Sequence, residues 1–237
     1  MEKISQAFIL AAGRGSRMLH LTDDKPKPLV KVADKCLIDY NVEHIKAAGI
    51  KNCMVNLCYK GEMIKNHLLE KNLLDFSFSE EEEALETGGG IKHALPKMEN
   101  KAFFVINSDA LWTDKKGDAL LENMQKAWNP EKFDMMIMLQ PIKLSYGVGE
   151  NGDYTLSKDE CPLRRHDAQT KAPYIYGGVL ICKPEVFANE PEGKYSLVRI
   201  FDRLEQEKRL GAYIHNDKWF HVGDPEATKI AEKCFSK

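Results

Sequence analysis

Long hydrophobic runs are missing from this chain, and so is any marked excess of one charge. No apolar stretch approaches the ~20 residues that a helix needs to cross a bilayer, so no membrane-spanning segment is expected. The 34 basic and 36 acidic side chains give a formal net charge of −2, which offers no general attraction to nucleic acid or to a membrane surface. Positive charge must act locally, so we expect small-molecule partners, no nucleic acid and no membrane.

The cysteines lack the spacing of a metal site. The chain has six of them, and no two form a Cys-x-x-Cys pair. This pattern predicts no zinc site and six free thiols, as is usual in a reducing cytosol. The first residues lead directly into an apolar stretch without a signal-peptide pattern, which favours a cytoplasmic location.

Repeats are absent as well, and the chain instead alternates between helical and strand-like patterns. Helices are predicted over 37–48, 61–72, 197–204 and 225–234, and strands over 8–12, 53–57, 76–79, 103–106, 135–139 and 174–182. Such alternation predicts an α/β fold, a Rossmann-like, mostly parallel sheet with helices on both faces. We expect one domain over 1–237, with the polar segment 145–172 forming a hairpin and loops over the sheet, where an acceptor pocket could be built.

What the sequence does contain is a glycine-rich turn directly after the first apolar run. Gly13 and Gly15 remove side chains there, and exposed backbone N–H groups in such a turn can cradle phosphate oxygens. Arg14 and Arg17 add positive charge, and Lys27 follows between two prolines. Neither a P-loop ending nor the third glycine of a dinucleotide-binding motif is present. For this segment alone, a polyphosphate site and an ordinary solvated loop both remain open.

Taken together, five segments closely resemble the sugar-nucleotidyltransferase family. Leu10–Met18 and Pro26–Pro28 match its pattern Leu-Ala-Ala-Gly-x-Gly-x-Arg-Met and Pro-Lys-Pro, and the likeness continues through 86–91, 107–109 and 219–223. The resemblance implies a glycosyltransferase-A-like nucleotidyltransferase fold. It also implies an enzyme that joins a nucleoside triphosphate to a sugar 1-phosphate and releases pyrophosphate.

The same resemblance assigns roles to individual residues. Arg17, Lys27 and Asp109 match the family's catalytic positions. The matched nucleotide-binding positions are Leu10, Ala11, Ala12, Gly13, Arg14, Gly15, Ser16, Glu81 and Gly88. The matched sugar-binding positions are Asn107, Gly147 and Gly178. The Glu-Lys pair that many relatives use to hold the sugar is not recognisable, so Arg164, Arg165 and Lys171 are either acceptor-phosphate ligands or part of a solvated loop.

Asp109 is the predicted magnesium ligand. It follows a buried strand, where ligands of open α/β sheets bind, and carboxylate oxygen suits Mg²⁺; an ordinary turn aspartate is the alternative. Relatives carry a second metal aspartate where this chain has His221, and Asp224 appears three residues later. Either Asp224 reaches the ion, or His221 contacts phosphate, or water replaces the ligand. Asp224 also suits an N-cap of the last helix.

The sequence specifies the identity of the nucleotide base less clearly than it specifies the phosphate site. Glu81 belongs to an acidic run that would ordinarily be solvated, but in the muramic-type uridylyltransferases that this chain most resembles, its position faces the pyrimidine edge. A carboxylate accepts a hydrogen bond from an N–H, which both uracil and guanine offer. Gly88–Gly90 would let the backbone approach a flat base, with a purely structural role as the alternative.

The expected activity is therefore a Mg²⁺-dependent transfer of a nucleotide from UTP to N-acetylmuramic acid 1-phosphate in cell-wall recycling. We expect a monomer or a small homo-oligomer. Two alternatives remain: a guanylyltransferase acting on mannose or heptose 1-phosphate, and a catalytically silent paralogue that binds nucleotide sugars and has a regulatory role.

Overall fold

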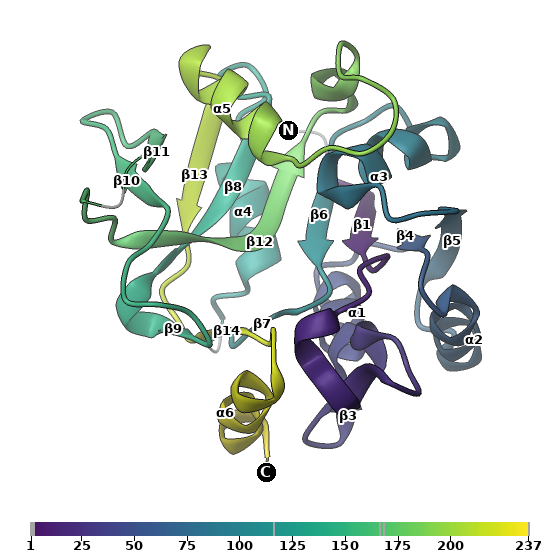
Figure 1. The fold of residues 1–237 in the computed structure, drawn as a ribbon. Coiled ribbons are helices and arrows are strands. Elements are labelled where there is room, and N and C mark those ends of the chain that lie inside the picture. The colour runs from purple at the N-terminus through teal and green to yellow at the C-terminus, as the bar shows by residue number, and fades with distance from the viewer. Residues whose placement is uncertain (1–2, 116, 166, 168, 237) are drawn as a thin grey trace.

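The computed structural model describes residues 3–115, 117–165, 167 and 169–236, and a central sheet organises this part of the chain (Figure 1). The helices are α1 (Leu37–Ala47), α2 (Gly61–Lys71), α3 (Glu86–Ala94), α4 (Leu120–Ala127), α5 (Val198–Gln206) and α6 (Pro225–Phe235). The strands are β1 (Gln6–Leu10), β2 (Lys31–Val32), β3 (Lys35–Cys36), β4 (Asn52–Leu57), β5 (Asp75–Glu80), β6 (Phe103–Asn107), β7 (Ala110–Trp112), β8 (Met135–Pro141), β9 (Ser145–Tyr146), β10 (Tyr154–Leu156), β11 (Pro162–Arg164), β12 (Tyr174–Cys182), β13 (Leu210–Ile214) and β14 (Trp219–His221).

The central sheet has a parallel half and a half that mixes both directions. Strands β5, β4, β1 and β6 are parallel neighbours, and Phe8 of β1 lies between Met54 of β4 and Val105 of β6. Strand β12 then runs antiparallel to both β6 and β8, while β13 pairs in parallel with β8. The predicted fold class is confirmed, and β12 is the antiparallel strand that joins the two halves.

Side-chain alternation along β1 places hydrophobic residues on both faces of the sheet. Ala7 and Ile9 join the core that α1, α2 and α4 cover, whereas Phe8 joins the core under α3 and α5. All three side chains are fully buried. Burying one large apolar side chain in this way stabilises a fold by about 1.5–3 kcal/mol. This two-sided burial explains why the strand is a continuous apolar run, and it fixes where the strand's carboxyl end emerges.

A third, smaller core closes the carboxyl end of the parallel strands. Met18, Val30 and Leu37 from the N-terminal third pack there with Phe220 and Val222. Strand β14 is paired antiparallel with β7, so that His221 lies opposite Ala110, and parallel with β9. The C-terminal segment is thereby brought beside the residues that follow β6.

The predicted hairpin in segment 145–172 is present, but its position differs from the expectation. Strands β10 and β11 extend the sheet at the edge of β12, where Tyr154 pairs with Tyr174, and do not lie over its face (Figure 1). The hairpin is anchored there because Arg164 Nε lies 2.9 Å from Asp202 Oδ1 on α5. Arg165 Nε donates to the Gly152 carbonyl. Residues 166 and 168 of this segment are outside the described part of the chain.

Two further expectations concern membrane-spanning helices and the state of the cysteines. No helix among the described residues combines the length and the apolar character needed to cross a membrane. All six cysteines are free, as predicted.

Candidate active site

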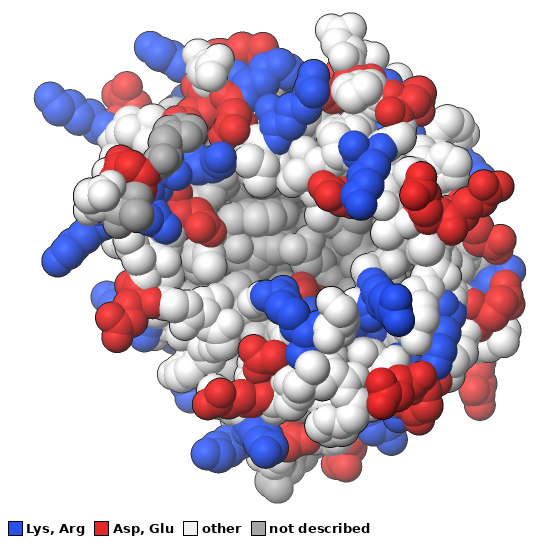
Figure 2. All heavy atoms as spheres, in the orientation of Figure 1, with Lys and Arg blue, Asp and Glu red and all other residues white. Residues whose placement is uncertain are grey.

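A cleft of about 460 Å³ opens at the carboxyl ends of β1, β4 and β6. In Figure 2 the centre of this face is hollowed, and basic side chains gather on its rim. Nine of the predicted site residues line the cleft: Leu10, Ala12, Gly13, Gly15, Ser16, Arg17, Lys27, Asn107 and Asp109. The parallel strands end together at this edge, which is why segments far apart in sequence meet here.

Two segments of the phosphate site are in direct contact through Gly15. Its φ is +69°, in the left-handed region that favours glycine, and a Cβ there would lie 2.7 Å from Lys27 Cβ. Ser16–Thr22 then forms a 3₁₀ segment, and the Met18 amide donates to the Gly15 carbonyl. By contrast, in the described part of the chain no atom beyond the two neighbouring residues lies within 4 Å of a Cβ built on Gly13, so that glycine faces open space in the cleft.

Lys27, Asp109 and His221 form one charged cluster. Lys27 Nζ lies 2.6 Å from Asp109 Oδ2, and His221 Nε2 lies 3.4 Å from the same oxygen. Lys27 is buried, with 8% of its surface exposed. Burial by itself would raise the pKa of Asp109, but the His221 hydrogen bond and the Lys27 charge outweigh it and hold this pKa well below its ordinary value. Asp109 is therefore a stable carboxylate at neutral pH.

A buried polar chain runs from the glycine-rich turn to Glu81. The Ala11 amide donates to Asn56 Oδ1 at 2.7 Å, and Asn56 Nδ2 donates to Glu81 Oε1 at 2.7 Å. The second Glu81 oxygen accepts from the Leu85 amide. Asn56 lines the cleft, whereas Glu81 lies behind it and is only 7% exposed. Asn56 was not predicted as a site residue, although an asparagine within an otherwise apolar strand is a usable signal.

Two of the predicted sugar-binding residues, Asn107 and Gly178, lie together at a bulge in β12. The register of β12 against β8 shifts between Tyr176 and Leu180, and Gly178 within it has a φ of +74°. A Cβ on Gly178 would lie 3.1 Å from Asn107 Cβ, so the bulge and Asn107 are packed together. Asn107 Oδ1 is buried and finds no hydrogen-bond partner among the described residues, which leaves an acceptor for a ligand. Gly147 lies against the His221 carbonyl, where a Cβ would come within 2.3 Å.

The remaining predicted residues lie around the cleft. The Arg14 guanidinium is 5.4 Å from the centre of the Tyr59 ring. Gly88 packs against Tyr195, and its amide donates to the Tyr195 carbonyl. Asp224 caps α6, because its Oδ1 accepts from two backbone amides of the first turn, at 3.0 and 2.8 Å. The cap is thus observed, while a metal role for Asp224 and a nucleotide contact at Gly88 stay predictions.

Ser196 is a further cleft residue that the sequence did not indicate. It lies in the segment before α5. That segment is held to α3 because the Leu197 amide donates to Thr87 Oγ1. A serine in a loop carries no pattern of its own, so only the packing of this segment identifies it.

Comparison with known proteins matches this chain to one family over nearly its whole length. Residues 6–233 match the family described as nucleotidyl transferase. A protein of Caulobacter vibrioides described as N-acetylmuramate alpha-1-phosphate uridylyltransferase is 40% identical over 231 residues, which cover 95% of each chain. One with the same description from Neisseria meningitidis serogroup B is 31% identical over 222 residues, covering 92% of this chain and 93% of that one.

A solved structure shares the fold. HddC from Yersinia pseudotuberculosis, complexed with GMP-PN, superimposes with a TM-score of 0.78 at 24% identity, covering 98% of this chain and all of that one. The family match spans nearly the whole sequence, and it includes the glycine-rich turn, Lys27 and Asp109 that meet in the cleft. The chain belongs to the nucleotidyl transferase family.

Proposed function

We propose that this protein transfers UMP from UTP to N-acetylmuramic acid 1-phosphate in the cytoplasm and releases pyrophosphate. The observation that carries the proposal is the convergence of the glycine-rich turn, Lys27 and Asp109 in one cleft. The two N-acetylmuramate alpha-1-phosphate uridylyltransferases, similar over more than nine-tenths of the chain, support the choice of substrate. Free cysteines suit a reducing compartment such as the cytoplasm. The acceptor, N-acetylmuramic acid 1-phosphate, would arise in cell-wall recycling.

The chain's own residues supply positioning and charge neutralisation. The acceptor phosphate oxygen would attack the α-phosphorus, the bond to the β-phosphate oxygen would break, and pyrophosphate would leave. Backbone amides of residues 12–16 and the Arg17 side chain would hold the outer phosphates, while Lys27 neutralises the α-phosphate. No general base is needed, because the attacking phosphate is already ionised.

Asp109 fits a magnesium site with one protein carboxylate. Lys27 and His221 both face Oδ2, and among the described residues no hydrogen bond reaches Oδ1. Mg²⁺ is commonly bound by one or two carboxylates together with waters and substrate phosphates, so a single aspartate is sufficient. When bound there, the ion would offset negative charge on the triphosphate. His221 cannot replace an oxygen ligand well, so we assign it a contact with Asp109 or phosphate.

The Asn56–Glu81 pair supports a base-reading role for the adjacent wall of the cleft. Glu81 is held by two hydrogen bonds, and one of them fixes the amide of Asn56, which reaches the cleft. Glu81 itself lies behind the cleft with both oxygens bonded, so the group offered to the base is the Asn56 amide, whose second Nδ2–H can donate to a carbonyl oxygen of uracil. Guanine carries a carbonyl oxygen as well, and HddC was solved with GMP-PN, so GTP is the necessary control.

The experiment is a matrix of triphosphates and acceptors read by pyrophosphate release. UTP, GTP, CTP and dTTP are each combined with N-acetylmuramic acid 1-phosphate, N-acetylglucosamine 1-phosphate, which lacks the lactyl carboxylate, and mannose 1-phosphate. We expect the largest kcat/KM for UTP with the muramic acceptor, and no turnover without a divalent ion. Preference for GTP would instead support the guanylyltransferase alternative. Absence of turnover, with UDP-sugar still bound, would support the silent paralogue.

A further inference from the structure

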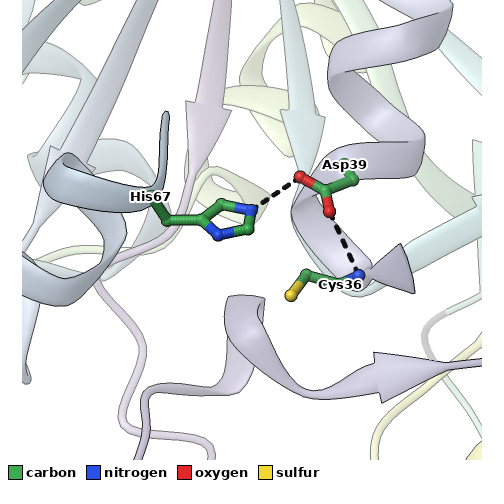
Figure 3. Close-up of side chains that lie close together, drawn as sticks. All are labelled: Cys36, Asp39 and His67. Atoms are coloured by element: carbon green, nitrogen blue, oxygen red, sulfur yellow. Dashed lines mark hydrogen bonds and ion pairs between the residues drawn. The ribbon is translucent and has the colours of Figure 1, made fainter. Parts of the chain in front are cut away.

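A second cluster of metal-ligating side chains lies at the junction of β3, α1 and α2. Cys36 ends β3, Asp39 lies in the first turn of α1, and His67 projects from α2 (Figure 3). One ligand atom of each residue lies within 4.8 Å of the other two. Cys36 and Asp39 are buried, at 7% and 3% exposed. The cluster shares no residue with the proposed magnesium site.

Local hydrogen bonds set the orientation of Asp39. Its Oδ2 accepts from the Cys36 amide at 3.2 Å, as in a helix capping box, and lies 3.0 Å from Lys71 Nζ. Its Oδ1 faces His67 Nε2 at 2.7 Å. The cap and the lysine therefore occupy one carboxylate oxygen and leave the other directed at the imidazole. Figure 3 shows the Cys36 sulfur on the same side of Asp39 as His67, below the Asp39–His67 contact.

We propose that Cys36, Asp39 and His67 form a three-ligand site for a zinc-class divalent cation. Thiolate, imidazole and carboxylate form a donor set that suits borderline-soft Zn²⁺ and not Mg²⁺, which prefers oxygen. Three protein ligands leave a fourth, tetrahedral position for water. Binding removes the Cys36 thiol proton, which is released to solvent. The negative charges of Asp39 and the thiolate are then balanced by the cation.

The Asp39–His67 pair needs only a small movement to reach a coordinated geometry, and the Cys36 sulfur, within 4.8 Å of both ligand atoms, must lie about 3.6 Å from them. Two ligands at about 2.0–2.1 Å from a tetrahedral zinc lie about 3.3 Å apart, so the Asp39–His67 pair must open by roughly 0.6 Å. The His67 side chain is 22% exposed, which allows its ring to move and gives the cation access from solvent. Without a cation, burial and the Asp39 charge raise the pKa of the Cys36 thiol, which keeps the thiol protonated.

Zinc would connect α2 to the segment that carries Lys27. The Leu37 amide at the start of α1 donates to the carbonyl of Val30, the residue directly after Lys27–Leu29. A cation bound by Cys36 and His67 would therefore link α2 to the start of α1 and, through that hydrogen bond, to the Lys27 segment. Because it binds only the folded chain, zinc at one hundred times its Kd should raise the melting temperature by about 5–10 °C.

The test uses the full chain after removal of metals and without nucleotide, so its outcome does not depend on the proposed activity. Co²⁺ is added as a spectroscopic probe, followed by Zn²⁺ in competition. We expect one equivalent of cobalt to give thiolate-to-metal charge-transfer and tetrahedral d–d bands, which zinc abolishes and millimolar Mg²⁺ does not. Cys36→Ser and His67→Gln should lose both bands and the thermal shift. Cys234→Ser, on α6 outside the cluster, should keep them.

Two results would overturn the proposal. The first is the absence of a cobalt–thiolate band in the unmodified protein, a measurement that does not depend on whether a variant folds. The second is an equal cobalt spectrum or an equal zinc-induced thermal shift in Cys36→Ser, which would place the metal elsewhere.

Discussion

Gly15→Ala tests the contact that joins the two halves of the phosphate site. A non-glycine residue in the left-handed conformation costs roughly 1–2 kcal/mol, and overpacking a filled site typically costs about 1–3 kcal/mol. Both apply at Gly15, where φ is +69° and the new methyl group would lie 2.7 Å from Lys27 Cβ. Cβ is fixed to the backbone, and Pro26 and Pro28 restrict that backbone, so Lys27 cannot simply swing aside. We expect the free energy of unfolding of Gly15→Ala to be about 2–4 kcal/mol lower than that of the parent.

For a chain of this size that loss corresponds to a melting temperature lower by about 5–15 °C. Turnover should fall roughly 10²-fold as well, because displacing Lys27 removes one preorganised cation from the cleft. Thermal unfolding followed by circular dichroism and kcat/KM from pyrophosphate release measure the two effects. Gly149→Ala is the matched control, since among the described residues no atom beyond the chain neighbours lies within 4 Å of a Cβ there, and it should leave both unchanged. A Gly15→Ala protein that melts and turns over like the parent would refute the reasoning.

Four further predictions follow from the ion pairs and caps. Lys27→Ala should reduce kcat by roughly 10²-fold or more, and near-normal kcat would exclude its assigned role. Asp109→Asn should shift the Mg²⁺ titration of activity to higher concentration, whereas superimposed curves would show that Asp109 is not a ligand. Asp224→Ala should lower stability by about 1 kcal/mol while Asp224→Asn preserves it, and a raised Mg²⁺ requirement in the Asn variant would identify a metal role instead. Hydrogen bonds from Arg209 lower the pKa of Asp134, so the Asp134 carboxylate stabilises the fold above pH ~4 and does so progressively less as the pH falls. The free energies of unfolding of Asp134→Asn and the parent, measured by chemical unfolding, should therefore differ most near pH 7 and converge in acid. A difference that does not change with pH would contradict this.

The prediction that this chain has no zinc site illustrates the limit of an argument from residue spacing. The absence of Cys-x-x-Cys pairs predicted no zinc site, and that rule reads only ligands that are close in sequence. His67 lies 28 residues from Asp39 and reaches it because α1 and α2 pack on the same face of the sheet. The proposed site would combine a cysteine at the end of β3 with an aspartate and a histidine from two helices, and such a combination leaves no recognisable spacing.

Neighbouring glutamates illustrate a second limit. Glu80 and Glu81 stand in one acidic run, and composition alone assigns both to solvent. In the structure the Glu80 side chain is 68% exposed, whereas Glu81 is buried with both carboxylate oxygens bonded. Successive residues at the end of a strand point to opposite sides, so the same residue type meets water at one position and Asn56 at the next.

By itself, the sequence determined the features that depend on contiguous residues. The apolar run before Gly13, the helical spacing of segments such as α1 and the proline-flanked Lys27 are local patterns, and each predicted its element within a few residues. The family resemblance already put His221 at the metal site of Asp109, 112 positions earlier in the chain. Only the tertiary structure decided that His221 and Lys27 both face Asp109 Oδ2 and that Asn56 forms a wall of the cleft. The physical reason is that these distances depend on strand order and register, which are fixed where β14 pairs with β7 and β4 pairs with β1. Each of these pairings joins strands that are remote in sequence.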